Sequence, residues 1–229
     1  MSRAVREDVA IIIPVYNEAR VIGTVLKHVL KHFKYVVCVD DGSSDASYDE
    51  IAKTKAYVVE HPINMGQGAA LQTGLEFSRQ LPVNYFVTFD ADGQHRIEDV
   101  KAMLSEIEAG DHDIILGSRF MGETVGMSGT KRAVLKAAIR FSNATSGLVL
   151  TDAHNGLRVF NRVVAEGMQI TLPDMGHASE IPEIIAEKQF RYKEVPVTIE
   201  YTDYSKAKGQ SILNAVNIGF DTLLRKVTR

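Results

Sequence analysis

The sequence predicts an α/β fold with a mostly parallel central sheet flanked by helices. Three observations predict it: short apolar runs rich in β-branched residues, segments of helical periodicity that alternate with them, and short connections in between. Strands and helices that alternate in this way form a parallel sheet covered by helices. With 229 residues and 45% hydrophobic side chains, the chain is expected to bury a core without disulfides or metal staples.

The first elements along the chain are a strand, a helix and a second strand. Residues 9–15 (VAIIIPV) form a nearly continuous apolar run, which is typical of a central strand covered on both faces. Residues 18–32 carry apolar side chains at helical spacing, and residues 35–39 form another apolar run. Each predicted strand is followed directly by a polar segment, where a loop is expected.

The alternation continues as far as residue 116. Helices are expected at 47–55, 66–80 and 97–109, and strands at 57–60, 85–89 and 113–116. After Gly117 the rhythm changes, because residues 121–130 (MGETVGMSGT) carry three glycines and no periodicity. Such a composition predicts a mobile loop.

The last part of the chain is expected to complete the site. Helices are predicted at 131–147, 179–188 and 212–227, strands at 157–160 and 190–199, and a polar, flexible segment at 201–211. The expected organisation is one domain over residues 1–211, followed by an amphipathic helix within 212–229. Such a helix packs on the domain, on a dimer partner or on a membrane surface.

Composition excludes several classes of protein. The 26 basic and 29 acidic side chains give a net charge of -3, which argues against a nucleic-acid partner. One cysteine, Cys38, excludes a disulfide framework. Since no run reaches 18 apolar residues and no signal-peptide core is present, the sequence predicts a cytoplasmic protein, at most peripheral at the cytoplasmic face of the membrane.

Two polar clusters follow the first two predicted strands, and ligands of open parallel sheets bind at such strand ends. Residues 14–18 (PVYNE) suit a binding loop, or a helix start with Asn17 as the N-cap. Residues 40–45 (DDGSSD) are explained in part by turn chemistry. Turn chemistry does not explain the two adjacent carboxylates Asp40 and Asp41, because their like charges repel each other. Either carboxylate is suited to accept hydrogen bonds from the N–H groups of a nucleobase or from the hydroxyls of a ribose.

A third cluster, residues 89–95 (FDADGQH), follows the strand predicted at 85–89. Alternate residues of an extended segment face the same way, so Asp90 and Asp92 can point at one ion. Their hard oxygen atoms suit Mg²⁺ or Mn²⁺, and Gln94 and His95 are near enough to contribute. Two aspartates at this spacing are also common in turns. The prediction of a metal site therefore depends on their position directly after an apolar strand.

Residues 64–68 (NMGQG) precede a predicted helix. They allow the helix N-terminus to approach a ligand, or they form a glycine turn with close packing. No glycine-rich phosphate motif of the Walker or Rossmann kind is present. The three clusters together predict a nucleotide diphosphate held through a metal ion.

Five segments carry a resemblance to a known family: PVYNE, VDDGSSD, NMGQGAALQTG, FDADGQH and GSRF, in this order. The sequence resembles family 2 glycosyltransferases of the GT-A fold, and within them the branch of dolichyl-phosphate and polyprenyl-phosphate sugar synthases. The resemblance is dense over residues 9–120 and thinner at TDAHNGLRVF and VPVTIEY. It implies an inverting enzyme of the hexosyltransferase type that uses a UDP- or GDP-sugar.

The resemblance also implies roles for individual residues. Nucleotide-sugar binding is implied for Pro14, Tyr16, Glu18, Val39, Asp41, Gly68, Ala91 and Lys206. Asp90 is expected beside the sugar or the diphosphate, and Asp92 with Gln94 on the divalent ion. Arg119 is expected near the phosphates, with a structural salt bridge as the alternative. Lys208 belongs to a loop that closes on the diphosphate.

The acceptor is less well defined. The dolichyl-phosphate enzymes carry an arginine six residues before the loop lysine, where this chain has Thr202. A bidentate phosphate clamp is therefore missing there, and Arg132 and Arg140 on the following predicted helix are the candidates that partly replace it. A polyprenyl phosphate is already ionised and needs no general base, whereas a saccharide hydroxyl does. Asp152 and Glu180 are the candidate bases, and each also suits a structural role as a turn, cap or helix-start residue.

Three functions follow from these expectations. The first is metal-dependent transfer of a sugar to a polyprenyl-phosphate-type acceptor. The second is transfer to a saccharide hydroxyl in cell-surface glycan assembly, and the third is a non-catalytic nucleotide-sugar-binding subunit. To reach a lipid acceptor, a chain without a membrane-spanning helix requires peripheral attachment or a small membrane protein as partner. A homodimer is the other assembly considered.

Overall fold

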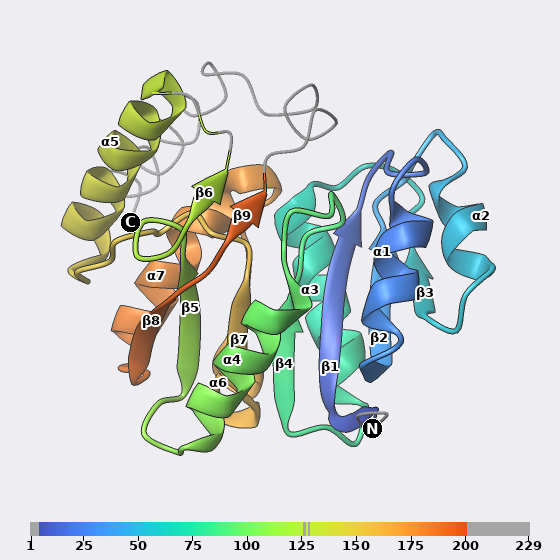
Figure 1. The fold of residues 1–229 in the computed structure, drawn as a ribbon, viewed down its shortest axis with the longest axis horizontal. Helices are drawn as coiled ribbons and strands as arrows, with labels where there is room; N and C mark the ends of the chain where they lie inside the picture. The colour runs from blue at the N-terminus through green and yellow to red at the C-terminus, as the bar shows by residue number, and fades with distance from the viewer. Residues whose placement is uncertain (1–4, 126, 128, 201–229) are drawn as a thin grey trace.

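The computed structural model describes residues 5–125, 127 and 129–200. Its centre is a seven-stranded sheet with the strand order β3-β2-β1-β4-β7-β5-β8 (Figure 1). The strands are β1 (Arg6–Val15), β2 (Phe33–Asp40), β3 (Tyr57–Glu60), β4 (Tyr85–Thr88), β5 (Ile114–Ser118), β7 (Arg158–Asn161) and β8 (Tyr192–Pro196). Only β7 runs antiparallel to its neighbours in this sheet. The predicted fold class is therefore confirmed.

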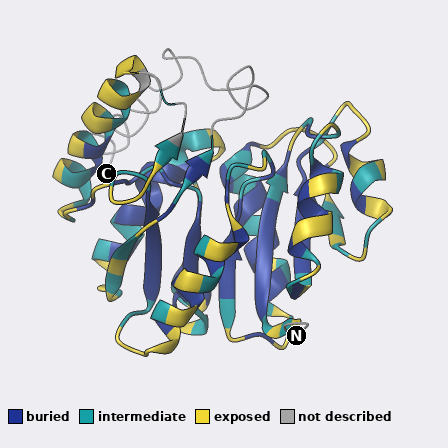
Figure 2. Cartoon of the chain, viewed as in Figure 1, coloured by how far each residue is buried: buried dark blue, intermediate teal, exposed yellow. Residues whose placement is uncertain are grey.

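Helices cover both faces of the sheet. They are α1 (Ile22–Val29), α2 (Ser47–Ala52), α3 (Gln67–Arg79), α4 (Ile97–Glu108), α5 (Gly129–Ser146), α6 (Arg162–Gly167) and α7 (His177–Glu187), with a 3-10 turn η1 (Asp174–Gly176) before α7. The strands are buried and the outer faces of the helices are exposed (Figure 2). None of the helices in the described ranges is both long and apolar enough to cross a bilayer.

The apolar run of β1 is buried because its two faces contact different helices. Ile11 and Ile13 pack in one core cluster with residues of α1 and α4. Ile12, between them, packs in a second cluster with residues of α3, α6 and α7. Successive side chains of a strand point to opposite faces, so a strand covered on both sides must be apolar at nearly every position.

Two predicted segments differ from the structure. The loop expected at 121–130 contains the short strand β6 (Thr124–Val125) and the first residues of α5. The strand expected at 190–199 is divided into β8 and β9 (Ile199–Glu200), and β9 pairs in parallel with β6. Strands of two residues have no periodicity to detect, and their pairing depends on a partner more than 70 residues away.

The short helix α6 was not predicted, although a local signal for it exists. The Asn161 side chain accepts a hydrogen bond from the backbone N–H of Val164 at 3.0 Å and thereby caps the helix. The described residues do not include the predicted polar segment 201–211, with Thr202, Lys206 and Lys208, or the helix predicted at 212–227. The roles of these residues and the domain boundary at residue 211 stay predictions.

Candidate active site

Two loops at the carboxyl ends of β1 and β2 are fastened to each other. Asn17 has a positive φ of 54°. Its backbone N–H donates to Ser43 Oγ at 3.0 Å, and its side-chain oxygen accepts from the Ser44 backbone at 2.8 Å. The backbone N–H of Glu18 donates to Ser47 Oγ at 2.7 Å. Asn17 as a helix N-cap was wrong, because α1 begins at Ile22 and the Asn17 side chain holds the neighbouring loop instead.

The residues expected around a nucleoside differ in exposure. Tyr16 is 43% exposed, whereas Glu18 is buried and Pro14 is half-buried. Val39 is fully buried, and its Cγ2 would lie 3.2 Å from a Cβ at Gly74 of α3. Val39 therefore faces the core. Of these four, Tyr16 is the side chain open to solvent, and the nucleoside pocket stays a prediction.

The adjacent carboxylates Asp40 and Asp41 are both buried, and each has its own partners. Asp40 accepts a hydrogen bond from the Ser43 hydroxyl. Asp41 accepts backbone N–H bonds from Met65 at 2.9 Å and Gly66 at 2.8 Å. Donors of this kind stabilise a buried carboxylate in its charged form. These hydrogen bonds offset the repulsion expected between Asp40 and Asp41.

The Asp41 carboxylate is also 2.7 Å from Nδ1 of His61. The other ring nitrogen of His61 is 2.9 Å from the Thr73 hydroxyl. With the two backbone donors, this contact makes Asp41 the residue that fixes the loop between β3 and α3. Sequence reasoning missed His61, which carries no motif and reaches Asp41 only through the pairing of β2 with β3.

The N-terminus of α3 is covered by protein. A side chain at Gly68 would have its Cβ 2.0 Å from the carbonyl oxygen of Leu172. A Cβ at Gly66, which has a φ of +93°, would lie 2.3 Å from the backbone nitrogen of Asp174. The glycines of NMGQG thus permit close packing, the alternative considered from sequence. The role of Gly68 toward a nucleotide sugar is untested.

Asp90 lies just beyond the carboxyl end of β4, with 31% of its side chain exposed. Its Oδ2 is 3.0 Å from Nε2 of His95, and its Oδ1 accepts from the Gln67 amide at 3.3 Å. Burial opposes its charge, but the hydrogen bond and charge of His95 and the charge of Arg158 outweigh burial and lower the Asp90 pKa. Gly156 leaves room for this carboxylate, since a Cβ there would lie 2.2 Å from Oδ2.

Asp92 lies beside it in the same turn. Its two oxygens accept from the Gln94 backbone at 3.0 Å and from the Gln94 amide at 2.5 Å. Burial, reinforced by the negative charge of Asp90, raises the pKa of Asp92 to about 6. Ala91, between the two, is buried in the core.

The donor atoms of this turn fit a hard divalent cation. Two carboxylates with mutual repulsion offer oxygen ligands, and Mg²⁺ or Mn²⁺ takes few protein oxygens and fills its shell with water and phosphates. In the described ranges, no three His, Cys, Asp or Glu side chains form a closed metal cage. Gln94 presents its amide N–H to Asp92 and must turn its oxygen outward to serve as a ligand.

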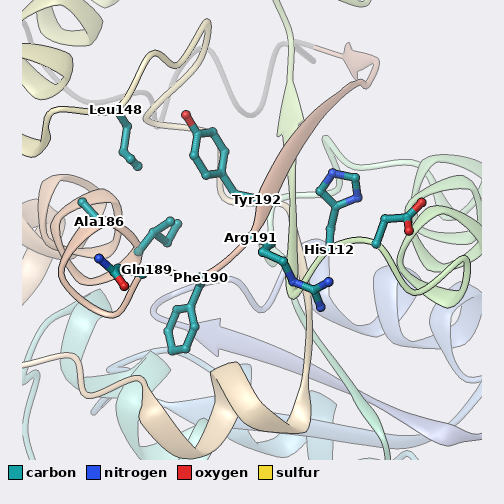
Figure 3. A pocket seen from close by; sticks show the side chains of 9 residues that line it. His112, Leu148, Ala186, Gln189, Phe190, Arg191 and Tyr192 are labelled. Carbon is teal, nitrogen blue, oxygen red and sulfur yellow. The ribbon is translucent and has the colours of Figure 1, made fainter.

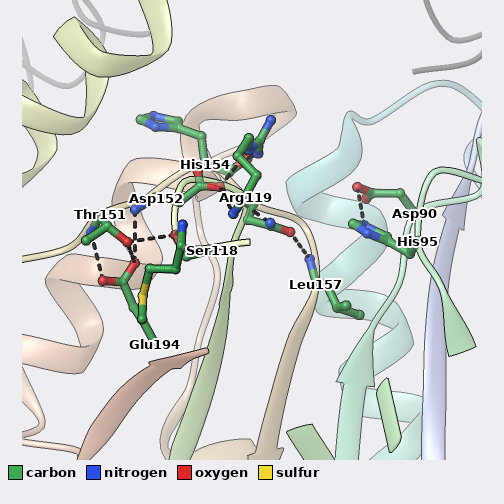
Figure 4. A network of polar contacts seen from close by, with 11 residues as sticks. Asp90, His95, Ser118, Arg119, Thr151, Asp152, His154, Leu157 and Glu194 are labelled. Carbon is green, nitrogen blue, oxygen red and sulfur yellow. Dashed lines mark hydrogen bonds and ion pairs between the residues drawn. The ribbon is translucent and has the colours of Figure 1, made fainter. Parts of the chain in front are cut away.

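A second polar network lies at the carboxyl end of β5 (Figure 4). Arg119 donates its backbone N–H and its Nε to Asp152 Oδ2, at 3.0 and 2.6 Å. Its Nη2 donates to the carbonyl oxygen of His154 at 2.8 Å. The Arg119 side chain is 10% exposed and that of Asp152 is fully buried. The structural salt bridge considered from sequence is therefore present.

Glu194 of β8 holds this network in place, and sequence reasoning missed it. Its carboxylate accepts the backbone N–H groups of Thr151 at 2.7 Å and Asp152 at 2.9 Å, and the Thr151 hydroxyl at 3.1 Å. The turn that carries Asp152 is thereby fixed to the sheet edge. A glutamate within a strand gives no local signal of such a role.

The second candidate base, Glu180, is also engaged. It is 6% exposed and accepts the backbone N–H groups of Thr171 at 3.1 and 3.0 Å and Leu172 at 2.9 Å, with the Thr171 hydroxyl at 2.5 Å. It fixes the loop that covers the N-terminus of α3. Both carboxylates considered as general bases thus hold loops in this structure.

Three buried cationic or titratable groups lie behind these carboxylates. Arg158 of β7 is 3% exposed, and its Nη1 and Nη2 are buried with no hydrogen-bond partner among the described residues. Burial lowers its pKa to about 10. Burial likewise lowers the pKa values of His154 and His177 to about 4. His177 Nδ1 is 2.6 Å from the carbonyl oxygen of Asp174. At neutral pH both histidines are therefore uncharged.

A cavity of about 520 Å³ lies away from this site (Figure 3). Among its lining residues, His112 precedes β5 and Arg191 precedes β8, whereas Leu148 follows α5. Because β5 and β8 are parallel, these two loops lie at the amino ends of the strands. The cavity is thus at the opposite edge of the sheet from Asp90 and Asp92.

Comparison with known proteins agrees with this geometry. The family model described as Glycosyl transferase family 2 matches residues 10–167. UDP-N-acetylglucosamine–dolichyl-phosphate N-acetylglucosaminyltransferase of Methanococcus voltae is 29% identical, over 95% of this chain and 95% of its own length. Polyprenol monophosphomannose synthase of Mycolicibacterium smegmatis is 30% identical, over 90% of this chain and 83% of its own.

A solved structure shares the fold at low identity. It is glucosyl-3-phosphoglycerate synthase from Mycobacterium tuberculosis in complex with Mn²⁺ and uridine-diphosphate-glucose. The two structures superpose with a TM-score of 0.66 at 15% identity, over 94% of this chain and 76% of the other. At this identity the similarity demonstrates the fold alone.

Proposed function

The chain belongs to glycosyl transferase family 2, and from this premise we propose the reaction of this glycosyltransferase. It moves a sugar from a UDP- or GDP-sugar to a polyprenyl phosphate, with inversion at the anomeric carbon and with a divalent cation. The observation that carries the proposal is the pair Asp90 and Asp92 at the carboxyl end of β4. Asp92 is buried beside a second carboxylate, which raises its pKa to about 6, and a bound cation relieves that repulsion.

The donor side of the proposal rests on oxygen ligands and charge. Asp92 and Gln94 hold Mg²⁺ or Mn²⁺, and Asp90 faces the sugar or the diphosphate. When bound, the cation supplies charge neutralisation to the leaving diphosphate. Arg119 adds positive charge at the carboxyl end of β5, which is separated from β4 by β7. The lysines of the 201–211 segment, Lys206 and Lys208, complete the diphosphate site. The Mn²⁺ complex of a protein with the same fold supports the choice of metal.

The acceptor side rests on the state of the two candidate bases. A saccharide hydroxyl needs a carboxylate that can take its proton, whereas a phosphate acceptor is already ionised. Asp152 is fully buried against Arg119, and Glu180 is engaged with Thr171 and Leu172. Neither offers an open carboxylate to a hydroxyl. This favours the phosphate acceptor, in agreement with the lipid phosphates in the names of two relatives. Arg132 contributes charge to that phosphate.

The proposal is tested by a screen of UDP- and GDP-sugars against polyprenyl phosphate and oligosaccharide acceptors, with Mg²⁺, Mn²⁺ or a chelator. The expected result is a lipid-phosphate product that forms only with a divalent cation. Asp92→Asn, which keeps size and removes charge, is expected to lose metal-dependent turnover, while the surface variant Asp49→Asn keeps it. A product on the oligosaccharide instead, or full turnover of Asp92→Asn, contradicts the proposal.

Sugar-nucleotide binding without any turnover is the outcome that a non-catalytic subunit gives. In that case calorimetry detects binding of the UDP- or GDP-sugar, while no combination of donor and acceptor yields product.

A lipid acceptor also implies that the protein acts at the cytoplasmic face of the membrane, as a monomer, as a homodimer or with a small membrane protein. Assays of the purified chain with detergent-dispersed acceptor separate the first two arrangements from the third, because only the third requires an added protein.

A further inference from the structure

Three cationic side chains form a stripe along the outer face of α5. Arg132, Lys136 and Arg140 are spaced four residues apart, and all three are exposed. Side chains at this spacing lie one above another on a helix surface. We call these three residues the α5 basic face. The helix sequence contains no aspartate or glutamate, so its positive charge is not offset within α5.

Among the residues that the structure describes, no carboxylate forms an ion pair with the α5 basic face. Elsewhere exposed cations such as Lys53, Arg96 and Lys193 pair with carboxylates. Like charges four residues apart destabilise a helix by about 0.2–0.5 kcal/mol per pair. The stripe therefore weakens α5 unless an anionic surface lies against it.

The same face is flat. Ala133, Ala137 and Ala144 are exposed beside the cations. The opposite face packs inward, with Ile139 at 7% exposure and Ser142 fully buried. Short alanine side chains allow a broad surface to approach the helix while the longer arginine and lysine side chains reach it. A long flat face with charges in a line fits a surface better than a compact ligand.

Both ends of α5 are tied to the active-site edge of the sheet. The guanidinium carbon of Arg132 lies 5.9 Å from the centre of the Phe120 ring. Phe120 follows Arg119 directly. At the other end, Asn143 exchanges two hydrogen bonds with the backbone of Leu150, at 2.8 and 3.1 Å. Leu150 leads into the turn that carries Asp152. The two ends of the helix are thus connected to the segments that carry Arg119 and Asp152.

We propose that the α5 basic face docks on the anionic surface of a lipid bilayer. The inference rests on the proposed function, since it brings the site edge to the surface from which a polyprenyl phosphate is taken. Charge complementarity selects this occupant. The whole chain carries a net charge of -3, so attraction must come from a local patch within the Debye length of about 8 Å. Basic residues near an anionic membrane each strengthen binding several-fold.

The test is co-sedimentation of the full chain with phosphatidylcholine vesicles that contain or lack phosphatidylglycerol. The expected result is binding to the anionic vesicles only, with loss at high salt. The variant Lys136→Gln is expected to partition about fivefold less strongly. The matched control is Lys27→Gln, which removes one exposed cation of α1 and keeps the binding of the parent chain.

Four outcomes overturn the proposal. The first three are no binding to anionic vesicles, equal binding to neutral ones, and equal loss in Lys136→Gln and Lys27→Gln. The fourth is binding to a short duplex DNA as strong as to anionic vesicles, which assigns the α5 basic face to polyanions in general. Transfer to a water-soluble short-chain prenyl phosphate distinguishes the two levels of inference. That reaction needs no vesicle, so its absence contradicts the proposed function. Its persistence in Lys136→Gln alongside weakened vesicle binding supports membrane docking.

Discussion

Arg119 donates two hydrogen bonds to one carboxylate oxygen, Oδ2 of Asp152, through its backbone N–H at 3.0 Å and its Nε at 2.6 Å. The Asp152 side chain is fully buried, so the carboxylate of this ion pair does not contact solvent. A buried ion pair of this geometry fixes the direction of the guanidinium group. In this structure Asp152 therefore has a structural role toward Arg119.

Removal of Asp152 is therefore expected to destabilise the fold. Asp152→Ala leaves the Arg119 charge buried without its partner, which costs about 3 kcal/mol of unfolding free energy. Urea denaturation measures this loss. The control is Glu50→Ala, which breaks the exposed pair with Lys53 and costs under about 1 kcal/mol. Unchanged stability of Asp152→Ala together with lost turnover would instead make Asp152 a general base.

Gly156 is expected to tolerate no side chain. In Gly156→Ala the new Cβ would lie 2.2 Å from Asp90 Oδ2, so the carboxylate must leave its position beside His95. Turnover is expected to fall at least tenfold, since misplaced catalytic groups lose orientation. The control Gly129→Ala meets no atom within 4 Å and keeps full turnover. Steady-state kinetics on both variants measure the difference, and equal activity refutes the geometric argument.

Acid is expected to unfold the protein in part through His177. Its folded pKa is about 4, below the ordinary value of 6.5, because burial disfavours the charged form. The unfolded chain thus binds the proton first. Stability from this residue is complete above pH 6.5 and falls as the pH drops from 6.5 to 4, by about 3 kcal/mol in all.

The variant His177→Gln separates this effect from other acid-sensitive groups. Its amide can still donate to the Asp174 carbonyl but does not titrate. The free energy of unfolding, measured by urea denaturation between pH 7 and pH 4, should therefore depend less on pH than in the parent chain. An unchanged pH dependence would mean that His177 is charged, or open to solvent, in the folded protein.

Lys208 is expected to act on the leaving diphosphate after the donor has bound. Lys208→Ala should therefore slow transfer more than it weakens nucleotide binding, since the lysine stabilises charge that develops during the reaction. Turnover and the dissociation constant for the nucleotide are measured on the same preparation. Equal losses in both would contradict a loop that closes on the diphosphate.

The fold class, the family and the enzyme class were predicted from sequence and are confirmed. The hydrophobic pattern was sufficient to predict β1, because burial on both faces requires apolar residues throughout the strand. It was insufficient to predict β6 and β9, because a strand of two residues has no periodicity. The site assignments for Asp90, Asp92 and the nucleoside-pocket residues stay predictions.

The sequence by itself determined that carboxylates follow the strands, because the order of strands and loops is local and the chain direction fixes which sheet edge they reach. Only the tertiary structure decided which carboxylates are engaged. Arg119 meets Asp152 across 33 residues, and Glu194 meets Asp152 across 42. The hydrogen bonds of a buried charge depend on such distant neighbours, which no local pattern records.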